Sequence, residues 1–237
     1  MIKVFRFAIL CLLPSLTLAG TPIDDTINCP IGGPKIQTVG TLSCSTSGRF
    51  DMTLRQVSSC DFVTRLPVCQ REGFPVYRAF DGVSVDTLLQ ITQTGPYKAT
   101  RQASRFLRAH VVEQALQGMD QGTLDQQGSF YTLLSGYQID PAKTYGDEGY
   151  YIAFQKAAGA FMPTATETDK AVIFLSAAMA RLQLGDVEKA RVNLQQGRKY
   201  VEEGQGVLVA YADQLQTCLA APKADTCQPT AMFFPAK

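Results

Sequence analysis

From residue 83 onward, apolar residues recur at the three- and four-residue spacing that is typical of amphipathic helices. In one such stretch Phe106, Leu107 and Val111 share a face. We expect helices over residues 84–93, 98–117, 130–136, 149–161, 169–184, 187–202 and 207–218. Turn-forming pairs such as Gly185-Asp186 separate them. This part of the chain therefore predicts short paired helices.

The segment before residue 83 has a different pattern. Phe50, Met52 and Leu54 alternate with polar residues, which predicts a half-buried strand. A similar run covers 35–39, and 45–48 is a plausible connection between two strands. A third strand is expected over 74–80, at a sheet edge because of Pro75. The overall expectation is a mainly α protein with a small β-rich N-terminal module.

The first 20 residues have the pattern of a secretory leader. Lys3 and Arg6 precede a short apolar run, and Thr17-Leu-Ala19 provides small residues for cleavage. We expect a signal peptide over 1–19 and a mature protein in the periplasm or outside the cell. No later apolar stretch reaches the roughly 20 residues of a membrane-spanning helix, so we expect no transmembrane segment.

Charge adds little to this picture. The chain has 22 Lys and Arg against 21 Asp and Glu, and the leader contains two of the basic residues. A neutral mature chain gives no electrostatic argument for nucleic acid or a membrane surface as partner.

Cysteines divide the chain further. Of seven cysteines, Cys11 lies in the leader, and the other six are an even number in an oxidising compartment. Four lie near the N-terminus and two near the C-terminus: Cys29, Cys44, Cys60, Cys69, Cys218 and Cys227. We expect a cysteine-rich β module over 20–82, a helical repeat-like domain over 83–217 and a tail over 218–237 closed by Cys218–Cys227.

Residues 171–197 resemble one tetratricopeptide repeat, a helix–turn–helix unit that stacks into binding solenoids. The resemblance rests on Phe174, Ala178, the turn at 184–186, Ala190, Leu194 and Gly197. Arg181, where an aromatic residue is usual, and the lack of proline near 202 depart from the pattern. An inexact half-repeat over 146–157 would require an inserted loop. An ordinary helical bundle is the alternative.

If the resemblance holds, it implies that the first helix of the unit lines a partner-binding face. The residues implied are Ile173, Ser176, Ala177 and Arg181. The partner would be a peptide or another protein of the cell envelope.

The N-terminal module resembles a zinc ribbon that has lost half its ligands. Cys29-Pro-Ile-Gly-Gly33 and Cys69-Gln-Arg-Glu-Gly73 are similar to its two knuckles, with the second cysteine replaced. The resemblance implies that Cys29 pairs with Cys69, which leaves Cys44 to pair with Cys60. Sequential pairing, favoured mildly by loop-closure entropy, and residual zinc binding are the alternatives. Residues 59–69 are similar to a run in exported bacterial proteins that join such a module to helical repeats.

Two further features suggest chemistry only weakly. His110 is the only histidine, so any Ser-His-Asp or Cys-His catalysis would depend on it; a packed or surface histidine is the expected alternative. A basic stripe at helical spacing could meet an acidic partner, or it could be a solvated face. Its members are Lys98, Arg101, Arg105 and Arg108. We identify no catalytic pair or cofactor motif and predict neither a cofactor nor a metal.

These observations predict an exported, non-enzymatic interaction or scaffold protein that acts through a helical-repeat surface. It could be a permanent subunit of a larger envelope assembly. The alternative is a thiol-redox factor or enzyme that uses an N-terminal cysteine, although an intact Cys-x-x-Cys motif is absent.

Overall fold

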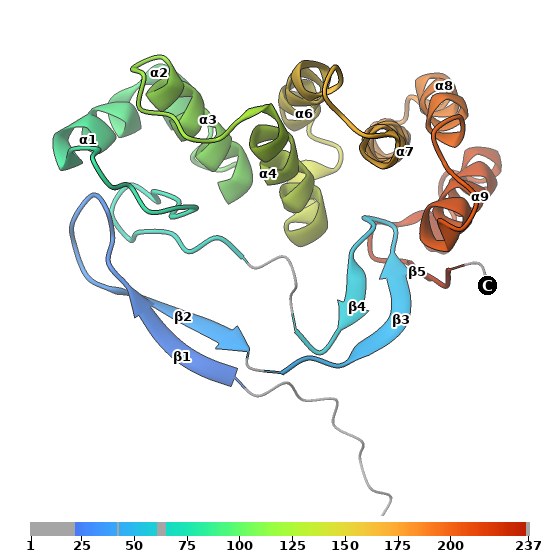
Figure 1. Cartoon of the computed structure of the whole chain (residues 1–237), viewed down its shortest axis with the longest axis horizontal. Helices are drawn as coiled ribbons and strands as arrows, with labels where there is room; N and C mark the ends of the chain where they lie inside the picture. Colours follow the sequence, from blue (N-terminus) through green and yellow to red (C-terminus); the bar gives the residue numbers. More distant parts are fainter. Residues whose placement is uncertain (1–21, 42, 61–64, 236–237) are drawn as a thin grey trace, which may run out of the picture.

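The computed structural model describes residues 22–41, 43–60 and 65–235. The protein is mainly α, with small antiparallel strands near the N-terminus, as the sequence pattern predicts. The helices follow one another in an arc, and the strands lie on its inner side (Figure 1). The expected signal peptide, with Cys11, lies outside the described residues. In the part of the chain described, no helix is both long and apolar enough to span a membrane.

Most helices lie on expected segments, although the ends of α4 and α8 differ by up to four residues and α2 and α5 were not expected as separate helices. Their bounds are α1 Val85–Gln93, α2 Gly95–Ala99, α3 Arg105–Gln117, α4 Gln126–Ile139, α5 Pro141–Thr144, α6 Glu148–Phe161, α7 Glu167–Gln183, α8 Val187–Arg198, α9 Gly206–Ala220 and the 3₁₀ turn η1 Asp225–Cys227.

Side chains at the helix starts explain why several helices begin where they do. Ser84, Asp125 and Asp147 each accept a hydrogen bond from a backbone N–H of the first turn. At α7, Thr166 and Asp169 form a reciprocal capping box. These caps satisfy N–H groups that have no partner within the helix.

The single helix expected over 98–117 is wrong, because the chain breaks between α2 and α3. The Ser104 hydroxyl caps α3 by accepting from the Phe106 N–H at 3.3 Å, and it lies 3.0 Å from Asp140 Oδ2. This new helix start separates Lys98 on α2 from Arg105 and Arg108 on α3. The four basic residues therefore do not form a stripe on one helix.

The strands form two small sheets. β1 (Pro22–Ile27) and β2 (Ile36–Thr41) make an antiparallel pair that runs from Pro22 opposite Thr41 to Ile27 opposite Ile36. We call this pair the ribbon. β3 (Thr46–Asp51) lies between β4 (Gln56–Ser58) and β5 (Met232–Phe233) in the second sheet.

Three strand expectations require correction. Residues 45–48 lie mostly within β3 and are not a connection. The strand expected over 50–54 ends at Asp51, because the buried Asp51 carboxylate accepts bonds from the Thr53 N–H and hydroxyl and makes a turn. Within 74–80, the described structure has only an isolated bridge between Val68 and Pro75.

Two of the three hydrophobic cores contain residues of the N-terminal segment. Met52 is fully buried against α7 and α9, and the Tyr211 hydroxyl donates to its carbonyl at 2.8 Å. Phe74 and Cys69 are buried against α1 and α3. The third core lies among α4, α6 and α7. The N-terminal segment thus crosses the inner side of the helical arc and packs against both of its ends (Figure 1).

Candidate functional site

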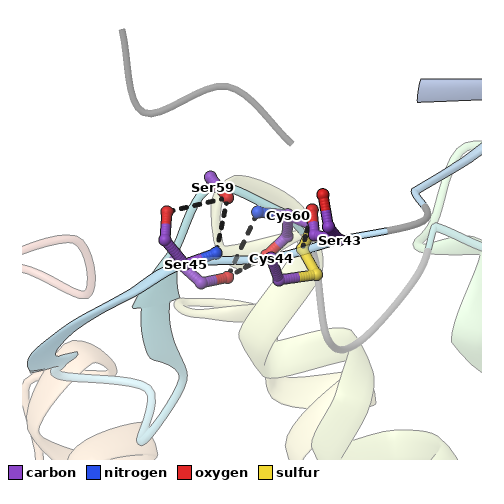
Figure 2. Close-up of a disulfide and its surroundings, with 6 residues drawn as sticks. Ser43, Cys44, Ser45, Ser59 and Cys60 are labelled. Carbon is purple, nitrogen blue, oxygen red and sulfur yellow. Dashed lines mark hydrogen bonds between the residues drawn. A yellow bond between two sulfur atoms is a disulfide. The ribbon is translucent and has the colours of Figure 1, made fainter. Parts of the chain in front are cut away.

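The structure contains three disulfides, and they lie in different surroundings. Cys29 pairs with Cys69 and Cys44 with Cys60, the nested arrangement that the knuckle resemblance implies. Cys218 pairs with Cys227, and both are fully buried. Cys69 is also buried, whereas Cys44 is exposed and Cys60 half-buried. Cys29 is half-buried, so the Cys44–Cys60 disulfide, drawn in Figure 2, is the most accessible of the three.

A cleft of about 930 Å³ lies beside the accessible disulfide. Its walls come from the ribbon, the end of β4 with Cys60, and residues 65–67. Arg105 of α3 completes the lining. We call this space the ribbon cleft.

The ribbon cleft follows the outer edge of β2. Five consecutive β2 residues, 37–41, line it, whereas β1 contributes only Asp25 and Ile27. Side chains alternate across a strand, so a run of consecutive residues marks an edge and an i, i+2 pair marks a face. No described strand pairs with β2 on that side. The cleft therefore presents an unpaired strand edge.

The cleft lining is mostly uncharged. Five of the fifteen lining residues are serine, threonine or glycine, and the charged members are Asp25, Arg65 and Arg105. Arg105 Nη1 donates to the Leu66 carbonyl at 2.7 Å, and its Nε lies 3.9 Å from Asp140 Oδ2. Arg105 thus ties the 65–67 wall to α3 and α4.

The four residues implied by the tetratricopeptide resemblance do not form an exposed face. Ile173, Ser176 and Ala177 are at most 3% exposed, because α7 packs against both α6 and α8. The half-buried Arg181 guanidinium lies 4.2 Å from the centre of the Tyr151 ring and 3.5 Å from Asp186. This burial corrects the expected exposure.

The basic residues also have internal roles. Arg101 forms an ion pair with Glu72. Arg108 Nη1 donates to the Gly73 carbonyl at 2.6 Å, and burial lowers the pKa of its guanidinium. Lys98 and Arg101 are both exposed. Together with Arg105, two of these arginines hold the 66–73 segment against the helices.

Glu113, which the sequence analysis did not single out, makes a comparable clamp. It is fully buried and accepts from the Tyr77 hydroxyl at 2.6 Å, from the Leu124 N–H at 2.7 Å and from the Thr123 N–H. Burial raises the pKa of the Glu113 carboxyl, but these hydrogen bonds and Arg78 outweigh it and hold the pKa below its usual value. The available signal in the sequence was that Glu113 lies seven residues after Phe106, on the apolar face of the expected 98–117 helix.

His110 is not placed for catalysis. It is 5% exposed, and burial, with a smaller effect of Lys156, lowers its pKa to about 4. It is therefore neutral at pH 7, and its buried Nδ1 has no hydrogen-bond partner among the described residues. Nor do the described ranges contain a group of three or more His, Cys, Asp or Glu residues arranged to hold a metal ion.

No protein-family model, curated protein or solved structure matches this chain.

Proposed function

We propose that this chain is an exported, non-enzymatic interaction protein that binds an extended segment of an envelope protein in the ribbon cleft. The observation that carries the proposal is the unpaired β2 edge along the cleft. An extended peptide can add to such an edge through main-chain hydrogen bonds, with specificity from side-chain pockets.

The exposure of the ribbon supports a partner at this place. Val39 is 69% exposed and Ile23 is 39% exposed. A two-stranded ribbon is marginally stable in water unless another layer covers it. A bound strand would extend the sheet and cover these apolar side chains.

The chemistry of the lining favours a neutral segment with small or hydroxyl-bearing side chains. Ser58, Ser59 and Thr41 offer hydroxyl groups, and Asp25 and Arg65 have opposite charges. Its volume of about 930 Å³ is near the upper end of the roughly 300–1,000 Å³ range of ligand sites. A space of this size can take several residues of an extended chain.

In this proposal the helices are the frame of the site. We regard α7 and α8 as a tetratricopeptide-like hairpin, since the small residues expected at its crossing, Ala178, Ala190 and Gly197, are all buried. Three disulfides are typical of an oxidising compartment, which supports export together with the predicted leader.

Site-specific photocrosslinking in the cell envelope tests the proposal. A photoreactive amino acid at Val39 is expected to capture one defined protein, at a segment that mass spectrometry can map. The matched control carries it at Val192, which is 55% exposed on α8. A synthetic peptide of the mapped segment should then bind the purified chain. The proposal fails if the two positions give the same products or the peptide does not bind.

A further inference from the structure

We infer that Cys44–Cys60 is an exchangeable disulfide whose reaction partner is a dithiol, such as the Cys-x-x-Cys site of a thiol oxidoreductase. The inference goes beyond peptide binding and does not depend on it. Exposed disulfides are more readily reduced than buried ones. Cys44 is exposed and Cys60 half-buried, whereas in the Cys29–Cys69 pair Cys29 is half-buried and Cys69 is 1% exposed, and Cys218 and Cys227 are fully buried in a core.

The surroundings of the disulfide give an attacking thiolate access. Cys44, Ser59 and Cys60 line the ribbon cleft, so the loop of a partner has room to approach. Figure 2 shows Ser43, Ser45 and Ser59 beside the disulfide, at the ends of β3 and β4. By contrast, Cys69 of the Cys29–Cys69 pair is buried with Ile31 and Phe74 in an apolar core, and the half-buried Cys29 packs against that core.

The pairing of β3 with β4 does not depend on the Cys44–Cys60 disulfide. The Ser59 N–H donates to the Ser45 carbonyl at 2.9 Å, and the Ser45 N–H donates to Ser59 Oγ at 3.0 Å. Further along, the Ser47 hydroxyl donates to the Val57 carbonyl at 2.9 Å. These bonds would keep the two cysteines close together after reduction, so the disulfide can open and close reversibly.

The exchange has two steps that balance in electrons and protons. A thiolate of the dithiol attacks Sγ of Cys44, the more exposed residue, and forms a mixed disulfide while the Cys44–Cys60 bond breaks. Cys60 leaves as a thiolate and takes up a proton; its sulfur lies 3.9 Å from the Ser43 carbonyl oxygen. The second thiolate of the dithiol then attacks the dithiol sulfur that is bonded to Cys44, and Cys44 is released as a thiolate. The protein disulfide gains two electrons, and the dithiol is oxidised to a disulfide.

Stepwise reduction of the native protein tests this assignment without any peptide ligand. The protein is equilibrated with increasing dithiothreitol and free thiols are alkylated and quantified by mass spectrometry. Cys44 and Cys60 are expected to react at a dithiothreitol concentration at least about tenfold below that for the other four cysteines. Simultaneous opening of all three disulfides, or a different first disulfide, would overturn the inference.

A trapping experiment identifies the attacked sulfur. A dithiol oxidoreductase whose second cysteine is replaced by serine should form a covalent adduct at Cys44. An adduct at Cys60, or none, contradicts the assignment. The Cys44→Ser/Cys60→Ser double variant should remain folded by circular dichroism and give no adduct. An adduct at another cysteine of this folded variant would also count against the inference. Because neither assay uses an envelope partner, these failures are distinguishable from failure of the proposed binding function.

Discussion

Helix α7 and the ribbon differ in what happens to their apolar residues. On α7, Leu175 and Met179 pack into the core with α8 and α9, while Ile173 and Ala177 pack into the core with α4 and α6. In the ribbon, Val39 remains largely exposed. The helices bury most of their large apolar side chains against each other and against the N-terminal segment, although Ile152 of α6 and Val192 of α8 remain 60% and 55% exposed. We propose the ribbon as the partner surface because it combines an exposed apolar side chain with a strand edge that no described strand pairs.

The largest effect is expected from a charge placed in the helical core. Ala190 is fully buried in the core that also contains Ala178. An Ala190→Arg substitution should lower the free energy of unfolding by more than the roughly 1–3 kcal/mol typical of overpacking, because it also desolvates an unpaired charge. Chemical denaturation would measure the loss.

Glu188→Arg is the matched control for this substitution. The Glu188 side chain is 84% exposed, on the same helix, so its replacement should change stability by no more than about 0.5 kcal/mol. If the two variants unfold alike, Ala190 is not at a helix crossing and the tetratricopeptide-like description of α7 and α8 fails.

A pH-dependent effect of similar size is expected from His110. Its folded pKa of about 4 lies below the ordinary value of 6.5, so the unfolded chain binds its proton more readily. The stability that the neutral form provides is fully present above about pH 6.5 and is lost as pH falls toward 4, to a limit of about 3 kcal/mol. His110→Gln should remove this part of the pH dependence.

Nuclear magnetic resonance can measure the His110 pKa directly, because the chain has a single histidine. A folded-state pKa of 6 or above would show that the His110 side chain is not buried on α3.

A smaller loss is expected where two helices approach closely. A Cβ at Gly136 of α4 would collide with the Tyr150 hydroxyl and lie 3.0 Å from the Phe106 Cβ. Gly136→Ala should therefore lower the free energy of unfolding by about 1–3 kcal/mol through overpacking. The preference of a helix for alanine over glycine offsets roughly 1 kcal/mol of this loss. Thermal unfolding measured by calorimetry would show the change.

Gly159 provides the opposite case on α6. A Cβ there meets nothing within 4 Å, so Gly159→Ala should stabilise the protein by up to about 1 kcal/mol. Equal melting temperatures for the two alanine variants would contradict the close crossing of α4 and α6.

The smallest effect on stability is expected in the ribbon. Val39→Lys replaces an exposed side chain and should alter the free energy of unfolding by no more than about 0.5 kcal/mol. It should nevertheless weaken binding of the mapped envelope peptide, measured by fluorescence polarisation, because it places a charge at the cleft edge. A large loss of stability would show that the ribbon edge is already covered by this chain.

Local sequence signals were sufficient for most helices and insufficient for the strands. Ser84 and the Gly185-Asp186 turn mark helix ends that the structure has within one or two residues. The break at Ser104 was missed because the apolar spacing continues across it. The strand over 50–54 was misjudged because Asp51 and Thr53, polar residues expected to face outward, are buried through hydrogen bonds to each other.

The ribbon cleft could not have been predicted from the sequence. Its walls come from strands, a disulfide and an α3 arginine that are brought together only by tertiary packing. Conversely, the helical periodicity that suggested Ile173 and Ala177 as binding residues cannot separate a face covered by a neighbouring helix from one left open. Burial on two sides is a property of the packed array.

Hydrogen exchange of the purified chain, with and without the mapped peptide, tests the central claim most directly. In the free protein, β2 amides at 36–41 should exchange quickly, and those of α7 slowly. Addition of the peptide should slow exchange in β2 and leave α7 unchanged. Protection that appears on the helices while β2 remains fast would contradict the assignment of the ribbon cleft as the binding surface.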